Sequence, residues 1–237
     1  MGKESNSTSW SRIAGIVSIS LAVLFILSTL VALVADFLLV TPFSASDFHN
    51  FLETLVLLSS LLVVASVAIL VVAIVFCKCS SLISQRYGLR ILFASAVTLV
   101  FATALNVADA CISYSINETP LAGGIVPLSL VSFITDFGWL VFAIYVVAYI
   151  LFLVSSFLMR DRTGVKEFHV AGVLFVFWLL IELADTSLTI LPTISPSISI
   201  VLLVYVILPF IGGVSAAGSF AVFGVALRRV AASEARL

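Results

Sequence analysis

The stretch FLETLVLLSSLLVVASVAILVVAIVFC, residues 51 to 77, carries one charged side chain, Glu53, and is followed directly by Lys78. A helix needs about 20 predominantly apolar residues to cross the ~30 Å hydrocarbon core of a bilayer. The stretch is longer than that, so it predicts a transmembrane helix that ends at a basic residue.

The same pattern recurs along the whole chain. Windows of about 19 residues predict six spans, which cover residues 13–40, 51–77, 91–115, 125–159, 168–191 and 198–227, with tails over 1–12 and 228–237. The fourth is longer than one crossing needs, and we interpret the excess as tilt or an extra turn rather than two short spans. The chain is 10% charged, against about 25% in soluble domains. We therefore expect an all-α, polytopic membrane protein with six transmembrane helices.

The basic residues predict the orientation. All 11 Lys and Arg lie near the N-terminus, in the loops after the second and fourth spans, or near the C-terminus. Six spans place these four regions on one side, which the positive-inside rule makes cytoplasmic. We expect both termini in the cytoplasm and the protein in the plasma membrane or a secretory-pathway membrane. The sequon Asn117-Glu118-Thr119 then lies in an outer loop, and Asn117 is a glycosylation candidate.

A repeat of about 75 residues is visible in the polar positions. Ala-Asp pairs occur at 35–36, 108–109 and 184–185, each near the outer end of an odd-numbered span. Each following span runs back to a basic residue: Lys78, Arg160 and Arg228. Two interpretations stay open, namely three repeated helical hairpins in parallel orientation and convergence between apolar segments.

Eight of the 12 acidic residues fall on the outer side, where the sequence provides no base to pair with them. Glu182 and Asp185 are three residues apart, as are Asn106 and Asp109, so each pair shares one helix face. Side-chain oxygens suit protons or hard cations, and ionisable residues within spans are candidates for function. The candidate ion-binding or proton-binding residues are Glu182, Asp185, Asn106, Asp109, Asp36, Glu53 and Asp136. The alternative is that these groups simply face water or lipid headgroups.

Two functions follow as hypotheses. The first is a small transporter or channel for protons or cations with an acidic outer mouth. The second is a non-transporting scaffold, assembly subunit or receptor-like protein that associates through the sixth span. Small residues at Gly213, Ala217 and Ala221 allow another helix to approach this span closely, within the chain, in a homo-oligomer or in a membrane-protein partner.

The remaining motifs predict little chemistry. Cys77 and Cys79 flank Lys78 at a cytoplasmic helix end, which is a position typical of S-palmitoylation, with unmodified thiols as the alternative. The sequence carries no phosphate-binding loop, dinucleotide fingerprint or histidine-based metal motif. We expect no enzymatic activity, no cofactor, no metal site and no nucleic-acid partner.

Overall fold

The computed structural model describes residues 4–40, 48–121, 124, 126–190 and 206–235. Within this part of the chain there are six helices and no strand. The helices are α1 (Glu4–Val40), α2 (Phe48–Tyr87), α3 (Arg90–Leu121), α4 (Leu128–Thr163), α5 (Glu167–Ile190) and α7 (Leu208–Glu234). All six are long and apolar enough to cross a membrane, so the all-α, six-span prediction is confirmed.

The helices extend beyond the predicted spans. The predicted tails over 1–12 and 228–237 are largely helical, because α1 begins at Glu4 and α7 continues to Glu234. The sixth span was predicted from residue 198; α7 begins at Leu208, and residues 198–205 lie outside the described residues. At 1.5 Å per residue, the 40 residues of α2 measure about 60 Å, twice the hydrocarbon core. Several helices therefore project out of the bilayer.

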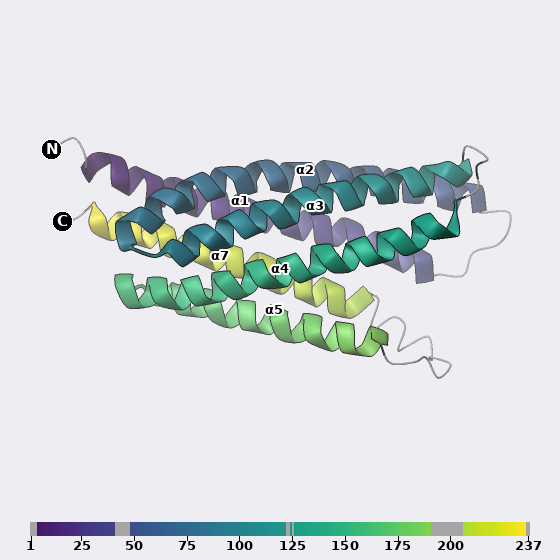
Figure 1. Ribbon diagram of the computed structural model, residues 1–237. Coiled ribbons are helices and arrows are strands. Elements are labelled where there is room, and N and C mark those ends of the chain that lie inside the picture. Colours follow the sequence, from purple (N-terminus) through teal and green to yellow (C-terminus); the bar gives the residue numbers. More distant parts are fainter. Residues whose placement is uncertain (1–3, 41–47, 122–123, 125, 191–205, 236–237) are drawn as a thin grey trace.

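The helices follow one another around the bundle in chain order. Each packs against the next one along the chain, and α7 packs against α1, which closes the arrangement (Figure 1). Both termini and the turns after α2 and α4 lie at the same end (Figure 1). Gly88 and Gly164 follow these two helices in the left-handed region, with φ of 67° and 71°, where a residue without Cβ is favoured.

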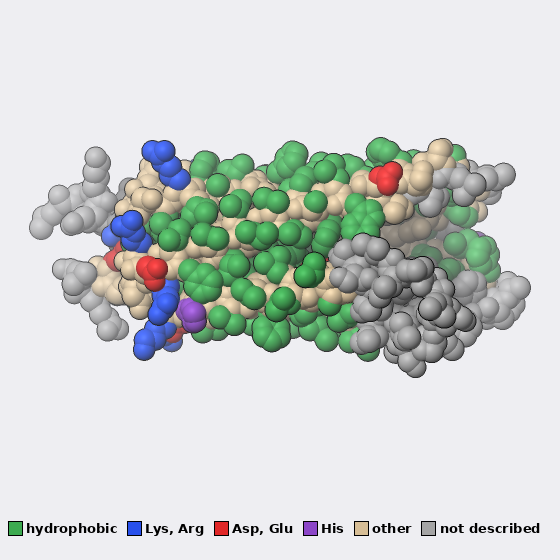
Figure 2. Space-filling model, turned by 60° about the horizontal axis from the view of Figure 1, so that its bottom comes forward, with side chains coloured by type: hydrophobic (Ala, Val, Ile, Leu, Met, Phe, Trp, Pro, Cys, Tyr) green, Lys and Arg blue, Asp and Glu red, His purple; other side chains and the backbone are tan. Residues whose placement is uncertain are grey.

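The visible basic side chains lie at one end of the bundle (Figure 2). The Lys and Arg side chains visible in Figure 2 gather at the end that holds the termini, which we call the basic end, and a wide apolar belt separates them from the other end. At the basic end, Arg86 pairs with Glu234 at 2.8 Å, and Tyr87 donates a hydrogen bond to the same carboxylate. Arg229 pairs with Glu167. These contacts tie the end of α7 to both α2 and α5.

Aromatic side chains fill the middle of the bundle. The rings of Phe76, Phe152 and Phe223 contact one another, with centroids 5.8, 6.2 and 6.4 Å apart. They come from α2, α4 and α7, the second helix of each hairpin. The aromatic core, as we define it, consists of eight buried side chains: Phe76, Tyr149, Phe152, Phe168, Phe175, Trp178, Phe220 and Phe223.

The contact between α1 and α7 depends on two glycines. A Cβ on Gly224 would lie 2.5 Å from the Gly15 carbonyl oxygen, and one on Gly15 would lie 2.6 Å from the Gly224 carbonyl oxygen. One turn farther along α1, the Ser18 hydroxyl donates a hydrogen bond of 2.7 Å to the Phe220 carbonyl. Small residues let backbones approach closely where lipid competes with protein for apolar surface.

We expect Gly224→Ala to destabilise the bundle by about 1–3 kcal/mol, because the new methyl group would meet backbone atoms and force α1 and α7 apart. Thermal unfolding of the purified protein in detergent measures the effect. Gly138→Ala is the matched control, since nothing lies within 4 Å of a Cβ at that helical position and alanine favours a helix by about 1 kcal/mol over glycine. Equal losses of melting temperature in both variants would contradict this account of the contact.

Candidate functional site

Glu182 lies between α5 and α7. One of its carboxylate oxygens, Oε1, is 3.0 Å from the position that a Cβ on Gly212 would occupy, so the glycine leaves room for the carboxylate beside α7. From Lys166, 16 residues correspond to about 24 Å along the helix axis, which is within the hydrocarbon core. Glu182 is thus half-buried at a helix-helix contact rather than in open water.

Aromatic rings fill the interior of the bundle on the side of Glu182 that faces the basic end. Trp178 lies one helical turn deeper on the same face of α5, and its ring stacks on Tyr149 at a centroid distance of 4.0 Å. Tyr149 in turn contacts Phe175 and Phe220 at 5.5 and 5.9 Å. The route from Glu182 toward the basic end therefore leads directly into the aromatic core.

The polar face of α3 is turned to α2 instead. The Asn106 amide donates a hydrogen bond of 3.0 Å to the Ser66 hydroxyl, and the Asn117 amide donates one of 2.7 Å to Ser59. Asn117 thus lies within helix α3, which extends to Leu121, and the prediction that its sequon occupies an outer loop is wrong. An amide engaged between two helices is a poor acceptor for a glycan.

Asp109 occupies the same half of α3. Its Oδ1 atom is buried and has no hydrogen-bond partner among the described residues. Burying a carboxylate oxygen without a hydrogen bond costs free energy. Among the predicted ligands whose side chains are described, Asp109 alone has such an atom. The Asp109 side chain is therefore the strongest remaining candidate for a proton or cation contact on α3.

The other predicted ligands are exposed or have side chains outside the described residues. Glu53 is exposed and pairs with His49, one turn earlier on α2, at 3.2 Å. Asp136 is exposed on α4, 24 residues or about 36 Å from Arg160, which is beyond the core. Asp36 and Asp185 belong to α1 and α5, but their side chains lie outside the described residues.

The described candidates do not form one site. Asn106 contacts α2 whereas Glu182 contacts α7, and α4 lies between α3 and α5 (Figure 1). Among the residues whose side chains the structure describes, which excludes Asp36 and Asp185, no group of three His, Cys, Asp or Glu side chains could hold a metal ion. The described acidic candidates are thus scattered over α2, α3, α4 and α5 and do not converge.

The small-residue stripe of the last span is used within the chain. A Cβ on Gly213 would collide with the Thr29 side chain of α1. Ala217 is fully buried, and Ala221 packs against the core. The stripe is therefore occupied by neighbouring helices of the same chain, and a partner must use another face of α7.

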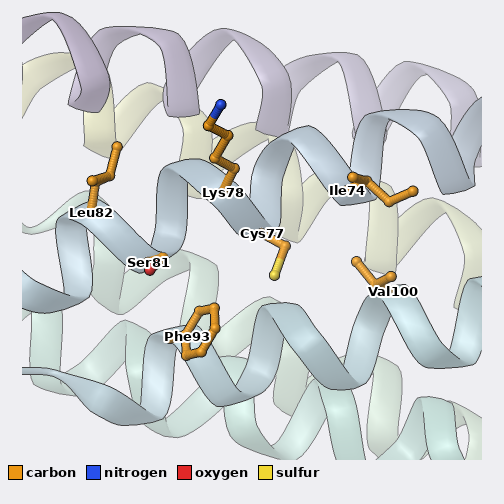
Figure 3. A pocket seen from close by; sticks show the side chains of 7 residues that line it. All are labelled: Ile74, Cys77, Lys78, Ser81, Leu82, Phe93 and Val100. Carbon is orange, nitrogen blue, oxygen red and sulfur yellow. The ribbon is translucent and has the colours of Figure 1, made fainter.

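The two candidate cysteines differ in surroundings. Cys79 is 1% exposed and belongs to the core, so its thiol is not accessible at the surface; its acylation stays a prediction. Cys77 lines a groove of about 430 Å³ between α2 and α3. Figure 3 shows its sulfur pointing into this groove, opposite Phe93 and Val100 of α3. Only Cys77 of the two is placed to reach a lipid-facing surface.

A basic groove was missed by the sequence reasoning. It lies between α1 and α7 at the basic end, and Arg12 and Arg228 both line it. Both arginines were visible as flanking charges, but nothing in the hydropathy pattern predicts that the first and last helices are neighbours.

Comparisons with protein-family models, with curated proteins and with solved structures gave no match.

We expect a maleimide reagent to label Cys77 much faster than Cys79 in the folded protein, because only the Cys77 thiol opens to a groove. Single-cysteine variants, with Cys111 also replaced, separate the two rates by mass spectrometry. Both thiols should react equally after unfolding in detergent and urea, which is the internal control. Equal rates in the folded state would show that the assignment of the buried thiol is wrong.

Proposed function

We propose that the protein is a non-transporting membrane component, a scaffold or assembly subunit that associates with other membrane proteins. The observation that supports this most directly is the aromatic core, whose buried rings fill the interior between the helices from Trp178 to Phe168, near the basic end. Transport across the bundle would require a polar path, and the described interior offers phenylalanine rings where such a path would run. We further propose that the basic end faces the cytoplasm.

The surface for association is the outward face of α7. Its small-residue stripe packs within the chain, so the side chains left for a partner are Ile211, Val214 and Val225, which are exposed apolar residues. Their spacing of three and eleven residues places them on one side of the helix. Association of two copies through this face would be isologous, as in most homodimers.

We expect a flux assay to distinguish this proposal from ion transport. Wild-type protein reconstituted into liposomes should give proton, sodium and potassium fluxes equal to those of protein-free liposomes. An added ionophore should dissipate the ion gradient in both kinds of liposome, as the positive control. Fluxes well above that background, reduced by Glu182→Gln but not by the exposed-acid control Glu53→Gln, would overturn the proposal and favour a transporter.

We expect Val214→Cys, in a background lacking the three native cysteines, to form an intermolecular disulfide when membranes are oxidised. Leu183→Cys on α5 is the control, because its position is more exposed, at 65% against 42%, but lies on another helix. Crosslinking at 214 and not at 183 is the expected result. Equal crosslinking at both positions would indicate random collision, and none at either would refute association of two copies through α7.

A second candidate function is kept because of Asp109. Its buried Oδ1 atom lacks a partner among the described side chains, and intramembrane carboxylates of this kind occur in proton and cation pathways. In a transporter, Asp109 and Glu182 would act at separate helix contacts, with the aromatic core as a gate that must open. The same flux assay, repeated with Asp109→Asn, tests this candidate.

A further inference from the structure

A groove of about 700 Å³ lies at the basic end between the start of α1 and the end of α7. Arg12, Ile13 and Ile16 line it from α1, and Arg228 lines it from α7 together with small alanine side chains. None of the predicted ion-binding residues and none of the aromatic core residues lines the groove. An inference from it does not depend on whether the protein transports ions.

The glycine contact positions one of the two arginines. Cγ of Arg228 lies 2.6 Å from the position that a Cβ on Gly15 would occupy. The aliphatic stem of Arg228 therefore crosses the α1 backbone where only glycine leaves room for it. Toward the basic end, Ala231, Ala232 and Ala235 leave the space between the helices open.

The groove carries an excess of positive charge. Arg12 and Arg228 are both exposed and stand on facing helices. Neither forms an ion pair with an acidic side chain among the described residues. Two acids at this end, Glu167 and Glu234, are already paired with Arg229 and Arg86. Asp161 belongs to α4, which does not line the groove, and the Glu4 side chain lies outside the described residues. Two guanidinium groups without such partners suit a phosphate, which they can bind through paired hydrogen bonds.

One wall of the groove is apolar and continues into the membrane belt. Ile13 and Ile16 are 38% and 50% exposed. They begin a row of exposed residues on one side of α1 that continues through Val23, Leu27 and Leu30. A ligand that fits both the arginines and this row has an anionic head and a hydrocarbon chain.

We propose that this groove binds an anionic phospholipid of the leaflet at the basic end. The phosphate lies between Arg12 and Arg228, and one acyl chain follows Ile13 and Ile16 along α1. A basic side chain near an anionic membrane surface contributes roughly a fivefold gain in binding. Removing both charges should therefore weaken lipid binding by about thirtyfold.

Native mass spectrometry of the purified full-length protein tests the proposal, with phosphatidylserine and phosphatidylcholine as the two probes. Wild type should retain phosphatidylserine in preference to phosphatidylcholine. The double variant Arg12→Gln/Arg228→Gln should lose that preference, and Arg12→Lys/Arg228→Lys should recover part of it. The matched control is Arg160→Gln/Arg162→Gln, which removes two exposed arginines from the last turn of α4 at the same end.

Three outcomes would overturn the proposal. The first is equal loss of phosphatidylserine in the groove variant and the α4 control, which would indicate attraction to the whole basic end. The second is unchanged binding in a groove variant that melts at the wild-type temperature. The third is displacement of the lipid by millimolar inorganic phosphate, which would indicate a site for free phosphate rather than for a lipid.

Discussion

The contact between α1 and α7 is the constraint on which the rest of the bundle depends. In a bilayer, apolar side chains gain little by leaving lipid for protein, so association must come from close packing and hydrogen bonds. Gly15 and Gly224 bring two backbones together, and Ser18 adds a hydrogen bond to Phe220. Once α7 is held there, Phe220 and Phe223 face α4 and α5, and the aromatic core can form around them.

Most polar side chains within the spans form hydrogen bonds inside the protein, and few of these bonds join two helices. Many serine and threonine hydroxyls donate to a carbonyl one turn earlier on the same helix, as Ser155 and Ser156 do, which satisfies them without a partner helix. A few reach another helix: Ser18, Ser215 and Asn106 contact α7, α5 and α2 respectively. These interhelical bonds determine which polar faces meet, and they separate the polar face of α3 from Glu182.

The sequence predicted the six spans well because membrane insertion acts on each segment by its own hydropathy. The span boundaries were less well predicted, since α2 continues past Lys78 as a helix where the apolar signal has ended.

The candidate site was predicted only in part. The depth of Glu182 followed from counting residues, but the neighbours of Glu182 and Asn106 depend on which helices pack together. Hydropathy carries no information on that pairing. Three of the core phenylalanines, Phe76, Phe152 and Phe223, come one from each hairpin, and the repeat stays a prediction.

The closure of the bundle also has a consequence for biogenesis. Ser18 and Phe220 are 202 positions apart in the chain, and α1 leaves the ribosome long before α7 does. Until α7 inserts, the face of α1 that carries Gly15 and Ser18 has no native partner and must remain in lipid or beside an insertion factor. Contacts of such long sequence separation form slowly, and the native contact of α1 with α7 can form only after α7 has inserted.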